Sequence, residues 1–307
     1  MTGGWRFWAW PWELARHGVL GMNARNLEML LELNPRRLRD LVDDKAATKE
    51  VCRQRGIPTP ATYAILERFS QLDQLDTMLA SRIEFVVKPA RGAGGRGILV
   101  ITGRTQFNYV TIAGLEVSPQ ELRDHVAGIL AGLHCAAGQG DKAIIESRIH
   151  PHPAFAALSA GGTPDLRIVL RSHRPLAAML RLPTSHSSGR ANLHQGAVGV
   201  GVDVSTGTTT LGVYHGRRIA RHPDTQGELA GRVIPHWREA VDMAARLAEA
   251  LGLGYLGVDL VLDGENGPVV LEANARPGLA IQIANRHGLR TAAGHLSPVH
   301  APVAYRG

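Results

Sequence analysis

The chain has 307 residues, of which 44% are hydrophobic and 20% charged, so it has the composition of a globular protein with ample material for a core. The net charge of +7 favours anionic partners, such as nucleotides, acidic peptides, nucleic acid or a membrane surface, but does not choose among them. The two cysteines, Cys52 and Cys135, have no metal-binding spacing, which argues against a disulfide framework and predicts a reduced, cytoplasmic setting.

Neither a membrane span nor a signal peptide is predicted. No apolar run approaches the roughly 20 residues of a spanning helix. The start, MTGGWRFWAWPWELARHG, has an apolar part that is broken by Pro11 and Glu13, and no small-residue cleavage site follows it.

A tryptophan-rich segment opens the chain and leads into a predicted helix. Four of the five tryptophans stand close together: Trp5, Trp8, Trp10 and Trp12. Packing of this segment on the body of the protein or on a second subunit is the preferred interpretation. Contact with a membrane interface is the alternative, because tryptophan beside basic residues suits the headgroup region. Apolar residues at helical spacing then predict a helix over 13–33, which ends at Asn34-Pro35.

The next part of the chain alternates between predicted helices and strands. Asp43 and Asp44 can cap a helix that closes at Gly56. The elements expected after it are a strand at 62–66, a helix at 70–81, strands at 84–88 and 97–102, a helix at 119–136 and a strand at 143–149.

The second half predicts more strands and one long amphipathic helix. The expected elements are strands at 165–171 and 176–182, loops and short strands over 183–210, a helix at 233–251, and strands at 255–262 and 268–273 joined by a hairpin turn at 263–267. Antiparallel hairpins mixed with helices favour an α+β fold or a mixed sheet over a doubly wound parallel sheet.

A glycine-rich loop follows the strand that ends at Lys88. Its glycines satisfy GxGxxG, but a strand follows where a dinucleotide fold needs a helix, and the Lys-Ser/Thr pair of a P-loop is missing. Such a hairpin can still bind a polyanion through backbone N–H groups and close as a lid, and Arg91 and Arg96 add positive charge. We therefore expect phosphate binding, with an ordinary exposed turn as the alternative. The candidate glycines are Gly92, Gly94, Gly95 and Gly97.

Three polar residues alternate near the C-terminus, in the stretch VVLEANARPGL. Glu272, Asn274 and Arg276 share one face if the strand geometry persists that far. The preceding strand of the hairpin carries Asp259, which antiparallel pairing can bring close to Glu272. Two carboxylates and an amide oxygen are hard ligands that suit Mg²⁺. A structural salt bridge from Glu272 to Arg276 or Arg181 is the alternative.

Two further polar clusters are candidates for the same site. Asp165 and Arg167 begin a strand on one face, and Arg190, Asn192 and His194 stand at alternate positions among small residues. The second cluster can line an anionic site, although a single histidine in such a loop is more often structural. No Ser-His-Asp or Cys-His arrangement indicates an acyl-enzyme, and no zinc spacing is present.

In this order, the motifs resemble those of ATP-grasp enzymes over roughly residues 40–290. The residues that carry the resemblance are Asp44-Lys45, Lys88 with Gly92–Gly97, Ile144-Ile145-Glu146, Asp259 and Glu272-Ala273-Asn274. Within the superfamily the chain is most similar to the RimK-like branch, and to its α-L-glutamate ligase-related proteins. The D-x-R, M-x-R, R-x-N-L-H-x-G and G-V-D patterns of that branch match Asp165–Arg167, Met179–Arg181, Arg190–Gly196 and Gly257–Asp259.

The resemblance implies an α+β ATP-grasp fold in which two α+β subdomains clamp ATP. Members of the family usually begin with a full α/β domain, whereas here a short helical segment takes its place. The expected division is a helical, tryptophan-rich segment at 1–40, a small subdomain with the glycine-rich lid at 41–145, and a large subdomain with the magnesium site at 146–307.

The resemblance also implies roles for single residues. Lys45 and Lys88 would contact the ATP phosphates under the glycine loop, Glu146 would meet the adenine, and Asp165 would hold the ribose. Magnesium, with manganese as the other candidate ion, would be bound by Asp259, Glu272 and Asn274. The residues expected to face the transferred phosphate or the substrate carboxylate are Arg167, Arg190 and Asn192, with Arg276 as an additional contact that the RimK-like branch does not predict.

The implied activity is an ADP-forming carboxylate–amine ligase that works through an acyl phosphate. Its substrates would be ATP, a carboxylate and an amine, with glutamate or another amino acid added to a carboxylate or a peptide. The alternatives are an ATP-grasp phosphotransferase and a non-catalytic nucleotide-binding or peptide-binding partner subunit. No nucleic-acid partner is expected, because no basic patch with interleaved aromatic residues is present. A homo-oligomer is left open.

Overall fold

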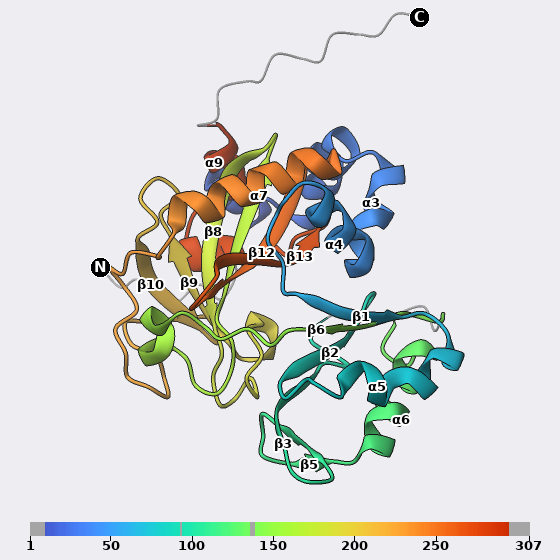
Figure 1. Ribbon diagram of the computed structural model, residues 1–307. Helices are drawn as coiled ribbons and strands as arrows, with labels where there is room; N and C mark the ends of the chain where they lie inside the picture. The colour runs from blue at the N-terminus through green and yellow to red at the C-terminus, as the bar shows by residue number, and fades with distance from the viewer. Residues whose placement is uncertain (1–9, 93, 136–138, 295–307) are drawn as a thin grey trace, which may run out of the picture.

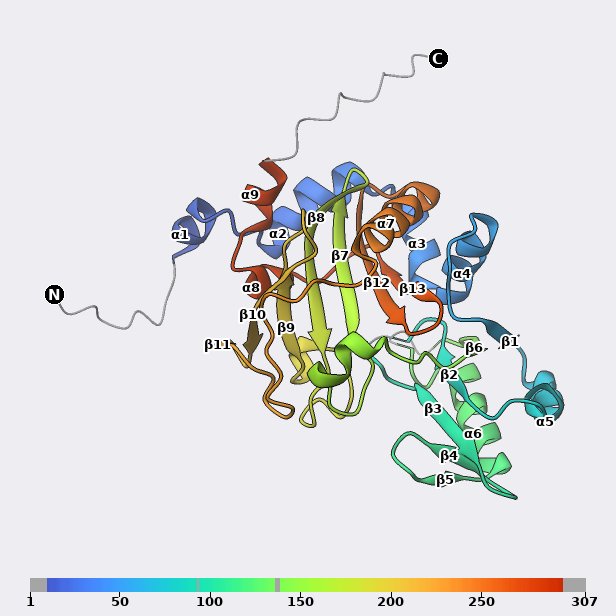
Figure 2. The ribbon, with the colours of Figure 1, turned by 60° about the vertical axis from the view of Figure 1, so that its left-hand side comes forward.

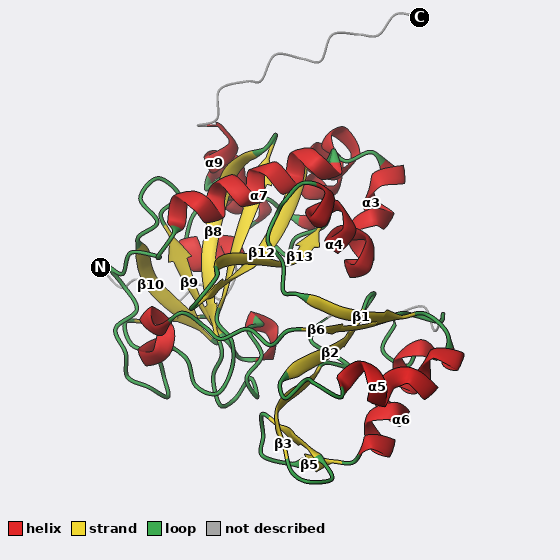
Figure 3. Ribbon diagram, in the orientation of Figure 1, coloured by secondary structure: helices red, strands yellow, loops and turns green. Residues whose placement is uncertain are grey.

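The computed structural model describes residues 10–92, 94–135 and 139–294, which form two antiparallel sheets with helices around them (Figure 1). In the first sheet the strands follow the order β1 (Thr62–Leu66), β6 (Ala143–Glu146), β2 (Phe85–Pro89), β3 (Leu99–Arg104), β4 (Tyr109–Thr111) and β5 (Glu116–Val117). In the second sheet they follow the order β11 (Arg217–Ile219), β10 (Thr209–Tyr214), β9 (Val198–Val202), β8 (Arg174–Leu182), β7 (Asp165–Arg171), β12 (Tyr255–Asp263) and β13 (Gly267–Asn274). Short 3₁₀ turns at η3 (Pro153–Leu158) and η4 (Leu193–Gln195) lie in the connections (Figure 3).

One face of the first sheet is covered by α6 (Pro119–Leu130), by the 3₁₀ segment η2 (Phe69–Gln74) and by α5 (Leu75–Leu79). Ser118 starts α6 with a reciprocal capping box to Glu121, which satisfies backbone donors that the first turn leaves open. Side chains that alternate along β2 and β3 meet those of α6 in the core of this sheet: Phe85, Val87, Ile101, Leu122, Val126 and Ile129.

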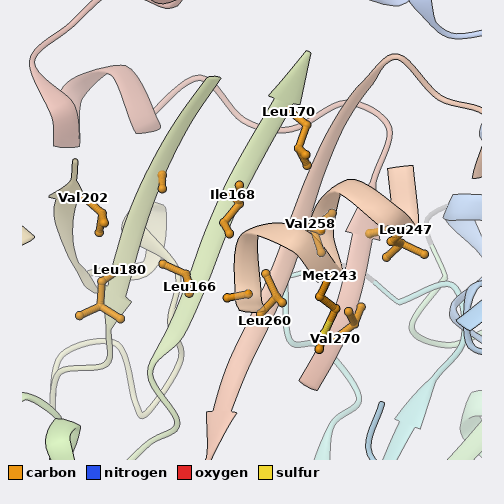
Figure 4. Packing of buried hydrophobic residues seen from close by; sticks show 14 of the residues in the cluster. Leu166, Ile168, Leu170, Leu180, Val202, Met243, Leu247, Val258, Leu260 and Val270 are labelled. Atoms are coloured by element: carbon orange, nitrogen blue, oxygen red, sulfur yellow. The ribbon is translucent and has the colours of Figure 1, made fainter. Parts of the chain in front are cut away.

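The second sheet is buried on both faces. One face packs on the amphipathic helix α7 (Trp237–Leu251), whose Met243 and Leu247 belong to the same buried cluster as Ile168 and Val258 (Figure 4). The opposite face packs on N-terminal helices and on α8 (Ile281–Asn285) and α9 (Leu289–Gly294) (Figure 2). The residues of that second core include Val169, Met179, Tyr255, Leu20, Met29, Leu30 and Ile281.

The N-terminal region differs from the single helix predicted over 13–33. It consists of α1 (Pro11–Arg16), α2 (Met22–Ala24) and the π-helix η1 (Arg25–Leu31). Gly18 separates α1 from α2 with a φ of 68°, and its backbone lies so close to Gly288 that an added Cβ there would be 2.1 Å away. A further helix, α3 (Arg36–Asp43), follows Pro35, although the sequence predicted no helix there.

The tryptophan-rich segment is only partly within the described residues, since Trp5 and Trp8 lie outside them. Trp10 and Trp12 stack on each other and are 53% and 55% exposed. None of the residues of α1 is buried against the rest of the described chain. Packing on the body, which is one form of the interpretation that we preferred, therefore does not hold for these two tryptophans, while packing on a second subunit stays a prediction.

Other predicted elements differ from the structure mainly at their ends. The predicted helix at 119–136 stops at Leu130, the helix at 233–251 starts at Trp237, and the strand at 143–149 stops at Glu146. The predicted helix at 70–81 is the 3₁₀ segment η2 followed by α5. The sequence did not predict β4, β5, β11, α8 and α9.

The helix α4 (Lys45–Gln54) connects the two sheets. Asp44 caps it, as the sequence predicted, by accepting from the N–H groups of Ala46 and Ala47. Its later turns reach the core of the second sheet through Cys52, while Ala46 packs on Ile144 in the first sheet. The division of the chain at residue 41 stays a prediction, and this packing ties α4 to both sheets. None of the helices in the described ranges combines the length and the apolarity that crossing a bilayer needs.

Asn34 joins the N-terminal helices to the second sheet and gives a first testable prediction. Its fully buried side chain donates to the carbonyl oxygens of Tyr255 and Ala275 at 2.7 and 3.2 Å and accepts from the N–H of Tyr255 at 2.9 Å. In Asn34→Ala these buried groups lose their partner, so we expect the free energy of unfolding in urea to fall by about 2–3 kcal/mol. The exposed Asn26→Ala is the matched control, and equal stabilities of the two variants would contradict the prediction.

Candidate functional site

A row of polar side chains crosses the second sheet on the face that the N-terminal helices share. The strand register places Arg167 opposite Asp259 and Asp259 opposite Glu272, on β7, β12 and β13. Asp165 and Arg181 form the neighbouring pair on β7 and β8. Because directly paired residues project from the same face of a sheet, these side chains gather at one end of it.

The approach of Glu272 to Asp259 depends on a β-bulge. Unbroken pairing from the turn at 263–267 would put Asp259 opposite Leu271 and leave Glu272 on the other face. The register instead shifts after Leu260, which pairs with Val270, so that Leu271 is the extra residue. The bulge therefore brings both carboxylates to one face.

Two arginines bind the buried carboxylates of this row. Arg167 donates to both oxygens of Asp259 at 2.7 and 2.6 Å, and Arg181 donates to Asp259 at 2.8 Å and to Asp165 at 2.6 Å. Asp165, Arg181 and Asp259 are all less than a tenth exposed. Two carboxylates and two guanidinium groups thus neutralise one another where an unpaired charge would be costly.

The two aspartates of this network differ in their ease of ionisation. Burial raises the pKa of Asp165, the charge of Asp259 adds to the rise, and Arg181 offsets only part of it. Burial opposes ionisation of Asp259 as well, but Arg167 and Arg181 together hold its pKa below the ordinary value. Asp259 is therefore the carboxylate that stays charged most readily.

Glu272 lies at the open side of the row. Its side chain is 35% exposed, and Lys45 Nζ lies 3.5 Å from its Oε2. We considered a salt bridge from Glu272 to Arg276 or Arg181 as the alternative. In the structure Glu272 pairs with Lys45 instead. Lys45 also donates to the carbonyl oxygen of Gly92 at 2.7 Å, so it connects Glu272 with the glycine loop.

Asn274 ends β13, and the predicted alternation ends with it. Its Oδ1 accepts from the N–H of Arg276 at 2.8 Å, which turns the chain out of the strand. Arg276 is exposed beyond that turn. The expectation that Arg276 continues the strand face is therefore wrong.

The donor set on β12 and β13 suits a divalent cation by its chemistry. Asp259, Glu272 and Asn274 supply two carboxylates and an amide oxygen, which are the oxygen ligands of Mg²⁺. Glu272 is more accessible than Asp259, which is already bound by two arginines. Among the described residues, no three histidine, cysteine or acidic side chains gather into a metal cluster, so this site would need the amide of Asn274.

Lys88 and Glu146 meet in the first sheet, on the face opposite α6. Lys88 Nζ lies 2.5 Å from one oxygen of Glu146, and Lys49 Nζ lies 2.8 Å from the other. Burial would raise the pKa of Glu146, but the two lysines hold it below its usual value, while burial lowers the pKa of Lys49. Lys49 was not among the predicted site residues, although it stands one helical turn after Lys45 on α4.

The glycine loop lies against the segment that contains Arg190 and Gln195. Gly94, Gly95 and Gly97 all have a positive φ, between 66° and 76°, which other residues rarely adopt. Gln195 Nε2 donates to the carbonyl oxygen of Gly94 at 3.2 Å. A Cβ added to Gly95 would lie 3.5 Å from the Cδ of Arg190. The loop between β2 and β3 of the first sheet thus contacts the connection between β8 and β9 of the second.

Asn192 has a structural task in this segment. Its side chain caps η4 by accepting from the N–H of His194 at 3.0 Å. Arg190 is exposed beside the loop. Of the two residues predicted to face the substrate here, Arg190 has a side chain that reaches the loop and Asn192 holds the local backbone.

A cavity of about 250 Å³ lies away from these residues. Its walls include Phe155, Leu158, Leu180 and Val233, and it contains none of the predicted site residues. The candidate site is therefore the region between the sheets, where the residues that meet are Lys45, Gly92, Gly94, Gly95, Arg167, Arg190, Asp259 and Glu272.

Solved structures similar to this chain include an ATP-grasp ligase, an L-amino acid ligase and a synthetase. ATP-grasp ligase PsnB in complex with its minimal precursor is 13% identical, with a TM-score of 0.45, over 85% of this chain and 60% of that one. The L-amino acid ligase from Bacillus licheniformis is 16% identical, with a TM-score of 0.43, over 80% and 43%. D-cycloserine synthetase DcsG is 15% identical, with a TM-score of 0.47, over 85% and 72%.

These likenesses are too distant to carry information on function, and the chain spans less than two thirds of the first two proteins. No curated protein matches the chain. A family match covers residues 24–297 and is described as sugar-transfer associated ATP-grasp. With the α+β ATP-grasp fold that its sequence predicted, the chain belongs to the sugar-transfer associated ATP-grasp family.

Proposed function

We propose that the protein is an ATP-dependent, ADP-forming carboxylate–amine ligase. The observation that carries the proposal is the meeting of a glycine-rich loop with Lys45 and Glu272 between the two sheets. A loop suited to phosphate therefore lies beside a donor set suited to magnesium. The closer resemblance to the RimK-like branch, and glutamate as the added amino acid, belong to the same proposal.

In this proposal Lys45, Lys88 and the backbone of the glycine loop bind the phosphates, and Glu146 lies toward the adenine. Lys88 would exchange its bond with Glu146 for one with a phosphate, and Lys49 would keep Glu146 in place. Asp165 is left out of the nucleotide contacts, because Arg181 engages both of its oxygens in a buried pair.

The metal would be held by Glu272 and Asn274 with Asp259 behind them. Bound Mg²⁺, or Mn²⁺, would neutralise charge on the phosphates. Arg167 orients Asp259 by a two-point contact, and Arg190 adds a cation beside the loop. These groups are in place before the reaction, so they can stabilise developing charge without reorganising.

The reaction balances in two steps. A carboxylate oxygen of the substrate attacks the terminal phosphorus of ATP, ADP leaves, and an acyl phosphate forms. An amine then attacks the acyl carbon, phosphate leaves, and the nitrogen releases a proton. The glycine loop would exclude water that could otherwise hydrolyse the acyl phosphate.

A second candidate is an ATP-grasp phosphotransferase. It is favoured by the family description, which names sugar transfer and no ligation. A sugar hydroxyl would then take the place of the carboxylate, and the product would keep the phosphate. A non-catalytic nucleotide-binding subunit is the remaining alternative, and it predicts no turnover with any acceptor.

An ATP-dependent screen tests the proposal. The protein is incubated with ATP, Mg²⁺ and pairs of carboxylates and amines that include amino acids, acidic peptides and sugar acids. We expect release of ADP and phosphate that requires both partners, together with a product whose mass joins the two. A product that gains only a phosphate would favour the phosphotransferase, and ATP binding without acceptor-dependent turnover would contradict both enzymes.

A further inference from the structure

The side-chain amide of Gln195 makes a contact that the proposed chemistry does not use. Gln195 belongs to η4, which is attached to the second sheet, and its Nε2 donates to Gly94 in the loop of the first sheet at 3.2 Å. Its Oε1 is buried and has no hydrogen-bond partner among the described residues. The bond to Gly94 is therefore the polar contact that fixes this amide.

The backbone that carries Gln195 is rigid on its own side. Asn192 caps η4, and Gly196 ends it with a φ of 93°. Thr184 fixes Gly196 by donating to its carbonyl oxygen at 2.7 Å. A side-chain donor held on such a backbone can fix the position of the glycine loop that it binds.

The glycine loop is held by its carbonyl oxygens. Gln195 binds the oxygen of Gly94 and Lys45 binds the oxygen of Gly92, so neither contact consumes an N–H group of the loop. A Cβ added to Gly94 would lie 3.6 Å from Gln195 Nε2, which shows how closely the amide approaches the loop. The contact of Gln195 with the loop thus occupies none of the N–H groups that an anion would need.

We propose that Gln195 is a positioning residue that latches the glycine loop against the second sheet. The latch acts before any ligand binds and has to open to let a nucleotide in or out. The part that concerns nucleotide exchange rests on the proposed function, whereas the closure of the loop itself does not.

Hydrogen–deuterium exchange of the full-length protein tests the latch. Gln195→Met and Gln195→Glu both remove the donor at nearly constant size. We expect the amides of residues 92–97 to exchange about fivefold faster in both variants, the effect of losing one ordinary hydrogen bond, with the thermal midpoint unchanged. Gln54→Met is the control, because Gln54 is exposed on α4 and its side-chain amide donates to Glu50, away from the loop.

Unchanged exchange of residues 92–97 in both variants would overturn the proposal. An equal rise in the amide exchange rate throughout the second sheet would also overturn it, because Gln195 would then merely stabilise the fold. Release of MgADP, followed by stopped flow with a fluorescent analogue, should accelerate by about the same factor. If the unaltered protein binds no MgADP, the proposed function fails, while exchange in the ligand-free protein still decides on the latch.

Discussion

Replacing Glu272 with glutamine is expected to lower kcat/KM of the ATP-dependent reaction about 100- to 1,000-fold, because a metal ligand supplies several kcal/mol of charge stabilisation in such reactions. The fold should persist, since the side chain is 35% exposed and its ion pair with Lys45 spans 3.5 Å. A change in unfolding free energy below about 1 kcal/mol is expected from the loss of such a pair. ADP release measured across a magnesium titration checks the effect, and a thermal scan checks the fold.

The matched control for this experiment is Glu265→Gln. Glu265 is an exposed glutamate in the turn that joins the same two strands, so it tests whether any charge change in this hairpin matters. We expect its activity and magnesium requirement to equal those of the unaltered protein. Turnover by Glu272→Gln at the unaltered rate, with the same magnesium dependence, would remove Glu272 from the metal site.

The hairpin that carries Glu272 shows how far sequence reasoning reaches. The turn at 263–267 and its apolar flanks predict the pairing of β12 with β13, because these signals are local. The bulge at Leu271 is not visible in the pattern, yet it decides the face on which Glu272 stands. The antiparallel pairing of this hairpin and the resemblance to ATP-grasp motifs both placed Glu272 near Asp259, but neither indicates the shift of register that brings the two carboxylates to one face.

Arg276 and Gly18 show where local patterns mislead. Strand alternation carries Arg276 onto the face of Glu272 only if β13 continues, but the side chain of Asn274 turns the chain first. The helical spacing over 13–33 does not reveal the close contact of Gly18 with Gly288, which lies far away in the sequence. In both cases a hydrogen bond or a close backbone approach outweighs the periodicity of the side chains.

Partners of buried charges are the least predictable feature from sequence. Lys49 and Arg181 were not among the predicted site residues, yet each binds a buried carboxylate. Lys49 and Glu146 are 97 residues apart in the sequence, and Arg181 and Asp259 are 78 residues apart. Such pairs follow from the tertiary packing of strands, and no periodicity marks them.

Arg181 is the residue whose loss should destabilise the protein most. It lies between Asp165 and Asp259, both of which are buried, and it donates to each of them. In Arg181→Met, Asp165 keeps its burial and its carboxylate neighbour but loses its counter-charge. We expect the free energy of unfolding in urea at neutral pH to fall by about 3–5 kcal/mol. The exposed pair of Arg221 with Glu228 provides the control, since Arg221→Met should cost less than about 1 kcal/mol.

The double variant Asp165→Asn, Arg181→Met distinguishes two causes of instability. One is the loss of a favourable ion pair, and the other is the cost of a buried Asp165 carboxylate without a counter-charge. Asp259 keeps its two-point contact with Arg167, so Asp165 is the carboxylate that Arg181→Met leaves without a partner. If that buried charge causes the damage, the second substitution should restore most of the lost stability, and the cycle of variants should show strong coupling between the two positions. A double variant no more stable than Arg181→Met alone would mean that the arginine stabilises the sheet through its packing and not through its charge.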